Sequence, residues 1–139
     1  LGERSHLLTP ELDMDTHVQD IVNGLEFEDL QEAILVGTSS SGLVTTAGAE
    51  EVPERLAYLV YLDALVPQDG QSVAYLFGPE ATARYQQRAE EGGDGWRIPA
   101  GPGSRSVHPR VTDMPLKTLH YRVTVQTPVA KALPRAYIR

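Results

Sequence analysis

A cluster of serines stands where an apolar segment meets a helical pattern, between Ala33 and Val44. Ser39, Ser40 and Ser41 form the cluster, and Gly37 and Gly42 flank it. A serine held at a sharp strand-to-helix turn exposes its hydroxyl, and the first free N–H groups of the helix lie beside it. A serine hydrolase presents its nucleophile in this way, so the cluster predicts acyl-transfer chemistry.

The cluster matches the nucleophile pattern G-x-S-x-G imperfectly in both possible registers. Around Ser39 the last glycine is replaced by Ser41, and around Ser40 the first is replaced by Thr38. Both flanking positions must be small, since the helix folds tightly back against the strand. Two other interpretations stay open. The hydroxyls could simply cap the helix, or the G-x4-G spacing could hold a phosphate, although Leu43-Val44 stands where the phosphate loop has Lys and Ser/Thr.

The elements around the cluster predict an α/β fold with a parallel sheet. Val18, Ile21, Val22 and Leu25 form one apolar stripe of a helix that Asp13 or Asp15 can cap. Apolar runs at 33–37 and 56–62 read as strands, and a helix over 42–51 joins them. A strand, helix and strand in about thirty residues form a βαβ unit. Because the runs are continuous, we expect both faces of the sheet to be covered.

The stretch from 66 to about 112 is rich in proline and glycine. Pro79 suits a first helical turn and Gly92 a helix end, which predicts a helix over 79–91. We also expect a short helix over 114–120 capped by Asp113, another near 127–133, and a final strand beginning near residue 136. Residues 66–120 are therefore predicted to form a loop-rich helical cap, and residues 1–65 with 121–139 the core.

The amino-acid composition limits the classes of partner that the chain could bind. Twelve basic and nineteen acidic residues give a net charge of −7, so a nucleic-acid backbone would be repelled. The chain has no cysteine, which excludes disulfides and thiolate ligands and fits a reducing compartment such as the cytoplasm. No apolar run reaches the roughly 18 residues of a membrane helix. We expect no cofactor, no metal, no nucleic-acid partner and no membrane partner.

Several longer segments resemble a known family. They include Gly2-Glu3-Arg4-Ser5-His6-Leu7, Asp15-Thr16-His17-Val18-Gln19-Asp20, Leu35-Val36-Gly37-Thr38-Ser39, Val52-Pro53-Glu54-Arg55 and Leu59-Val60-Tyr61-Leu62-Asp63-Ala64-Leu65-Val66-Pro67. Together they resemble the α/β-hydrolase fold, in the esterase branch related to plant methyl esterases and hydroxynitrile lyases.

The resemblance implies a small-molecule ester as the substrate and roles for particular residues. The family's Gly-His-Ser-Tyr-Gly-Gly aligns with Gly37–Gly42 and so places the nucleophile at Ser39, with the N–H of Ser40 in the oxyanion hole. Tyr75, Phe77 and Trp96 of the predicted cap are candidates to line the substrate pocket. Packing of the cap onto the core is the alternative role for these aromatics.

The departures from the family affect the expected activity. Its second oxyanion donor, catalytic acid and histidine correspond to positions outside the chain, and Asp63 is a possible acid without a histidine partner. His6, His17, His108 and His120 are expected on the surface. We therefore expect a partial α/β-hydrolase fold that is nearly inert alone and that self-associates through exposed sheet edges. A non-catalytic binding protein and hydroxynitrile-lyase chemistry are the alternative functions.

Overall fold

The computed structural model describes residues 2–101 and 110–139, and its first long helix begins where the sequence predicts. After a 3-10 turn, η1 (Gly2–Leu7), helix α1 spans Met14–Phe27. Asp13 caps α1 by accepting a 3.0 Å hydrogen bond from the N–H of Asp15. The predicted stripe faces inward, since Val18, Val22 and Leu25 are buried. No helix in the described ranges is long and apolar enough to cross a membrane.

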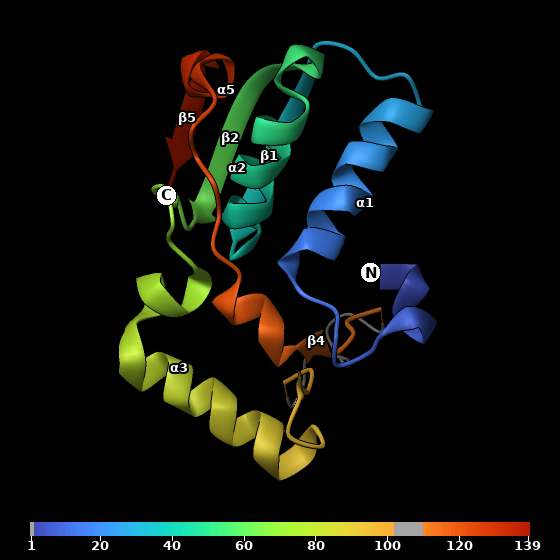
Figure 1. The fold of residues 1–139 in the computed structure, drawn as a ribbon, viewed down its shortest axis with the longest axis vertical. Helices are drawn as coiled ribbons and strands as arrows, with labels where there is room; N and C mark the ends of the chain where they lie inside the picture. The colour runs from blue at the N-terminus through green and yellow to red at the C-terminus, as the bar shows by residue number, and fades with distance from the viewer. Residues whose placement is uncertain (1, 102–109) are drawn as a thin grey trace.

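A parallel sheet of three strands forms the body of the molecule (Figure 1). Its strands are β1 (Ala33–Ser39), β2 (Leu56–Ala64) and β5 (Arg135–Ile138), in the order β1-β2-β5. Helix α2 (Ser41–Glu51) and the turn η2 (Pro53–Arg55) connect β1 to β2. The predicted βαβ unit and its parallel pairing are thereby confirmed.

Helix α2 packs between the sheet and α1 (Figure 1). Seven of its eleven residues are buried, which is why its sequence is small and apolar rather than amphipathic. Leu43 is fully buried, as is the Tyr61 ring on β2 beneath the helix. The Tyr61 hydroxyl shares a 2.8 Å hydrogen bond with Thr46 Oγ1, which donates to the carbonyl of Gly42. A satisfied polar chain thus crosses the core below the serine turn.

The two faces of the sheet differ in burial. Leu35, Leu59 and Tyr61 lie toward α2, and successive residues on each strand point to the opposite face. On that second face Ile34 and Val36 are 63% and 57% exposed, and Leu62 is 44% exposed. The expectation that both faces are covered is wrong for the described residues. Their continuous apolarity correctly indicated strands, but among the described elements a helix packs against only one face of the sheet.

The segment between β2 and β5 carries α3, α5 and the short elements (Figure 1). Helix α3 spans Val73–Gly92, and a kink at Gly78 (φ 80°, ψ 171°) divides it. The part after the kink is the helix predicted over 79–91, and the turn before it, capped by Ser72, escaped prediction. The remaining elements are β3 (Arg97–Ile98), β4 (Met114–Pro115), η3 (Leu116–His120) and α5 (Pro128–Ala132).

The predicted helix over 114–120 is partly wrong. Met114 and Pro115 form β4, which pairs antiparallel with β3, and only Leu116–His120 is helical, as a 3-10 turn. Asp113 caps nothing there. Its carboxylate instead contacts Arg97 Nη1 at 3.0 Å and accepts from the N–H of Ala100 at 2.9 Å. The ion pair between distant residues prevails over the local capping pattern. Helix α5 and strand β5 lie where the sequence predicts.

Candidate active site

The serine cluster forms a sharp turn between β1 and α2. Strand β1 ends at Ser39, which has a φ of +51°, and Ser40 begins α2 as its N-cap. A non-glycine residue rarely adopts positive φ, because its Cβ then crowds the backbone. The carbonyl of Ser39 accepts a 2.9 Å hydrogen bond from the N–H of Leu65, which holds the turn against the end of β2. Of the two candidate serines, Ser39 has a positive φ, whereas Ser40 has right-handed helical backbone angles (φ −67°, ψ −19°).

Close approach of α2 to the strands explains the glycines beside the turn. A Cβ on Gly37 would lie 2.3 Å from Thr45 Oγ1, and one on Gly42 would lie 2.0 Å from the carbonyl oxygen of Leu65. Ser41, which replaces the last glycine of the G-x-S-x-G pattern, fits the turn by forming hydrogen bonds. Ser41 Oγ accepts from the N–H of Thr38 at 2.8 Å and donates to the Thr38 carbonyl at 2.6 Å. Ser41 therefore closes the turn across β1 with two hydrogen bonds.

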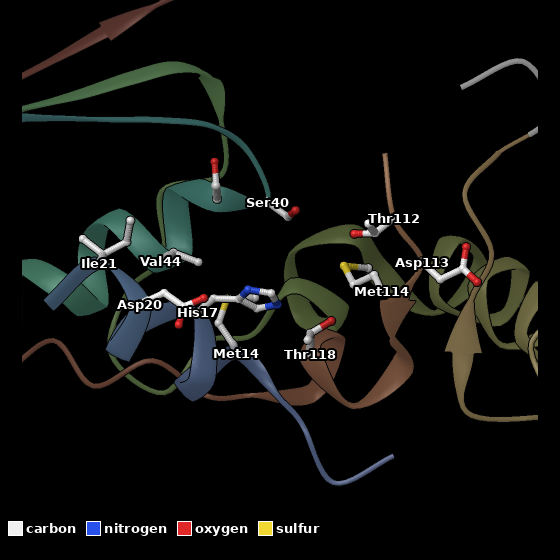
Figure 2. Close-up of a pocket in the computed structure, with 11 residues that line it drawn as sticks. Met14, His17, Asp20, Ile21, Ser40, Val44, Thr112, Asp113, Met114 and Thr118 are labelled. Carbon is white, nitrogen blue, oxygen red and sulfur yellow. The ribbon is translucent and has the colours of Figure 1, made fainter. Parts of the chain in front are cut away.

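Ser40 makes no capping hydrogen bond with its side chain. Its hydroxyl points into a cavity beside the turn (Figure 2). Its N–H precedes the hydrogen-bond ladder of α2, as the first N–H groups of any helix do. The family resemblance predicts an oxyanion-hole donor at this position. The alternative interpretation, in which the serine hydroxyls cap the helix, does not hold for the Ser40 side chain.

Asp63 lies at the same edge of the sheet as Ser39. Thr38 pairs with Leu62 and Ser39 with Ala64, so Asp63 is the extra residue of a bulge next to Ser39. It is exposed and has a φ of +42°. Bulges occur often beside active sites, where they turn a side chain toward the site. The structure thus brings Asp63 near Ser39 in the sheet.

The histidines do not gather at that edge. His6 belongs to η1, His120 ends η3, and His108 lies outside the described residues. The expectation of an exposed His17 is wrong, because His17 is half-buried on α1 and lines the cavity beside Ser40. Burial lowers its pKa from 6.5, and the Asp13 carboxylate opposes that shift. The sequence held one signal for this burial. His17 directly precedes Val18, so on the helix its ring lies at the border of the apolar stripe.

The cavity has a volume of about 420 Å³ and is open between α1, the serine turn and residues 112–118 (Figure 2). Its lining combines apolar side chains with hydroxyls, an imidazole and two carboxylates: Met14, His17, Asp20, Ile21, Ser40, Ser41, Val44, Thr112, Asp113, Met114 and Thr118. Residues of α1 that sequence reasoning left out thus form one wall. No group of three or more histidines and carboxylates within the described ranges could hold a metal ion.

The three aromatics predicted for the substrate pocket lie elsewhere. Tyr75 is 66% exposed on the first turn of α3. Phe77 stacks on Tyr85 with 5.8 Å between ring centroids and lines a second cavity with Arg84 and Arg88. The carbonyl of Trp96 accepts from the N–H of Leu116 at 2.7 Å, which joins β3 to the segment after β4. None of the three lines the cavity beside Ser40.

Comparisons with known proteins agree with this architecture. An extracellular α/β-hydrolase from a Paenibacillus species, described as sharing structural and functional homology with tobacco salicylic acid binding protein 2, superposes with a TM-score of 0.78 and 22% identity over 93% of this chain and 59% of its own. A pyrethroid hydrolase from Sphingobium faniae gives a TM-score of 0.64 and 20% identity over 91% of this chain and 57% of its own. The chain therefore has the α/β-hydrolase fold, as its sequence segments indicated.

A sequence relative adds an esterase to these comparisons. The carbendazim-hydrolysing esterase of a Nocardioides species is 37% identical over 89 residues, which are 61% of this chain and 37% of the relative. No family model matches the chain. The chain spans less than two thirds of the length of each of these proteins. It is thus similar to esterases and hydrolases over part of their length.

Proposed function

We propose that this chain carries the nucleophile of a serine hydrolase that acts on a small carboxylic ester, with Ser39 as the attacking residue. The observation that carries the proposal is the positive φ of Ser39 at the strand-to-helix turn, since this conformation exposes the hydroxyl above the ends of the parallel strands. Similarity to an esterase and to solved hydrolases supports the same class of reaction.

The chemistry follows from the geometry of the turn. Ser39 Oγ would attack the ester carbonyl carbon and lose its proton to a base, forming a tetrahedral oxyanion. The N–H of Ser40 would donate a hydrogen bond to that oxyanion. The bond to the alcohol then breaks, the alcohol leaves with a proton, and water hydrolyses the acyl-serine. Asp63, beside Ser39 on β2, is the candidate acid of this chain.

We expect the 139 residues alone to turn over slowly. A serine hydroxyl is a weak nucleophile without an adjacent base, and His17, on the cavity wall, belongs to a different segment from the family's catalytic histidine. Loss of a triad member lowers turnover by about 10^4-fold to 10^6-fold. We therefore expect the backbone of this chain to position the nucleophile, and full activity to require a base from outside these 139 residues.

Covalent labelling tests the proposal. The chain, alone and expressed with any flanking coding sequence, is treated with a fluorophosphonate, and the modified peptide is mapped by mass spectrometry. In the protein that carries flanking coding sequence and hence a base, we expect modification at Ser39, which Ser39→Ala abolishes and the matched control Ser40→Ala retains. The 139 residues alone should be labelled far more slowly, because their serine has no adjacent base. Labelling at Ser40, or intact ester hydrolysis by Ser39→Ala, would contradict the assignment. An unlabelled Ser39 in the extended protein would favour a non-catalytic binding protein.

A further inference from the structure

The cavity beside Ser40 combines side chains from three separate segments (Figure 2). We propose that it is a specificity subsite for one side of the ester, that it takes an uncharged and mostly apolar group with one hydrogen-bond acceptor, and that His17 recognises that acceptor. The inference rests on the proposed function only in taking Ser39, the neighbour of Ser40, as the reacting residue. The cavity's volume of about 420 Å³ lies in the range of roughly 300–1,000 Å³ that is typical of small-molecule sites.

The apolar part of the wall comes from both sides of the cavity. Met14 and Ile21 belong to α1, Val44 to α2, and Met114 to β4. Met14 is only 4% exposed and belongs to the hydrophobic core, so this wall is continuous with the packed interior. Figure 2 shows Met114 across the cavity from the residues of α1. Flexible thioethers on two sides suit a planar or irregular apolar group.

The charged part of the wall disfavours an anion. Asp20 and Asp113 line the cavity, whereas no lysine or arginine among the described residues does. The cations that pair with these carboxylates are Arg4 and Arg97. An anionic group would therefore lose its hydration without gaining a cation partner from the wall. A cation would gain little, because both carboxylates already have guanidinium partners.

His17 supplies hydrogen-bonding capacity within this apolar wall. Its imidazole extends from α1 into the space that faces Met114 and Thr118 (Figure 2). Burial lowers its pKa from 6.5 and so favours the neutral ring, which has one N–H donor and one acceptor nitrogen. A neutral donor recognises a carbonyl or ether oxygen of an uncharged ligand without attracting carboxylates.

Four probes of similar size test the selectivity. Acetophenone is neutral with an acceptor, ethylbenzene is neutral without one, benzoate is an anion, and benzylammonium is a cation. Binding of each to the 139-residue chain at pH 7.5 is measured by ligand-observed NMR titration. We expect acetophenone to bind best, with a millimolar Kd, and benzoate and benzylammonium to bind at least tenfold more weakly.

Variants assign the selectivity to His17. His17→Phe, which keeps a ring but removes the donor, should weaken acetophenone binding roughly fivefold to tenfold and leave ethylbenzene unchanged. His17→Gln, which keeps an N–H, should retain most of the binding. His120→Gln is the matched control, since His120 is exposed and outside the cavity. Val44→Phe, which fills the cavity from α2, should abolish binding of the neutral probes even if His17→Phe fails to fold.

The outcomes distinguish this inference from the proposed function. Equal binding of acetophenone and benzoate, tightest binding of benzylammonium, an unchanged Kd in His17→Phe, or binding that survives Val44→Phe would each overturn it. So would the absence of binding by any probe. Because binding requires no reaction, Ser39→Ala should bind acetophenone like the unmodified chain. If Ser39 is labelled but no probe binds selectively, only the subsite is refuted. If binding is selective but Ser39 is not labelled, only its assignment as the nucleophile is refuted.

Discussion

The serine turn and the segment over 66–120 are held together in different ways. The turn combines short-range contacts, such as the two hydrogen bonds between Ser41 and Thr38, with close contacts to Leu65 at the end of the next strand. In the later segment, residues sixteen or twenty positions apart are joined, as Arg97 is to Asp113 and Trp96 to Leu116. The turn is shaped by close backbone approach within and directly after one βαβ unit, and the later segment by pairing between separate short elements.

The proposed reacting residue, Ser39, and the proposed specificity subsite, the cavity beside Ser40, therefore depend on different parts of the fold. The position of Ser39 is set by the backbone of a single βαβ unit, which the sequence encodes in adjacent residues. The cavity beside Ser40 has walls from α1, α2 and residues 112–118, so its shape depends on how separate segments pack. Changes in the turn should therefore affect folding sharply, whereas changes in the later segment should have graded effects.

Gly42→Ala should give the largest effect. The added Cβ would lie 2.0 Å from the carbonyl oxygen of Leu65, a backbone atom that cannot rotate away. We expect the free energy of unfolding to fall by about 3 kcal/mol or more, measured by urea denaturation. Gly24→Ala in α1 is the matched control. Nothing lies within 4 Å of its added Cβ, and helix propensity should raise stability by about 0.5–1 kcal/mol. A mild Gly42→Ala would contradict the tight turn.

Asp113→Ala should give an intermediate effect. The Asp113 side chain is 11% exposed, and its loss removes the more buried carboxylate partner of Arg97 and the acceptor for the Ala100 N–H. We expect a loss of about 2 kcal/mol, with α1 and the sheet left intact in the far-ultraviolet circular dichroism spectrum. Asp94→Ala, which removes a more exposed contact to the same arginine, should cost less than half as much. Equal losses in the two variants would show that Asp113 is not the residue that joins β3 to β4.

The open face of the sheet should promote self-association, which we propose as a property of this chain. Its exposed apolar residues include Ile34, Val36 and Leu62. We expect Val36→Lys to weaken self-association about tenfold, or about 1.4 kcal/mol, in sedimentation velocity. Val129→Lys, an exposed position on α5, is the control and should leave it unchanged. A chain that is monomeric at all concentrations would refute the proposal.

The pH dependence of stability should give the smallest effect. Because the pKa of His17 is lowered on folding, the unfolded state binds more protons near neutrality. The stabilising effect of a neutral His17 is fully present above pH 6.5 and is lost as the pH falls below that value. We expect the stability difference between the unmodified chain and His17→Gln to shift in favour of the variant between pH 7.5 and pH 5.5, in urea titrations. A shift in the opposite sense would mean that folding raises this pKa.

Much of the fold could be predicted because its signals are local. The apolar stripe of α1, the cap at Asp13 and the strand-helix-strand unit require only neighbouring residues, and each lies where expected. The short helix over 114–120 was predicted incorrectly because Asp113 is both a good local cap and a partner for the distant Arg97. The exposed second face of the sheet also escaped prediction, since a run of apolar residues does not say which helices lie against it.

The sequence by itself determined the α/β class, the strand-to-helix turn and the small residues that surround Ser39, because a few adjacent side chains and dihedral angles define them. Only the tertiary structure showed that the backbone of Ser39 has a positive φ whereas that of Ser40 does not, and that Asp63 lies in a bulge next to Ser39. It also moved His17 from a presumed surface to a cavity wall and left Tyr75, Phe77 and Trp96 outside that wall. The physical reason is that a cavity is formed by segments distant in sequence, whose mutual packing no local pattern records.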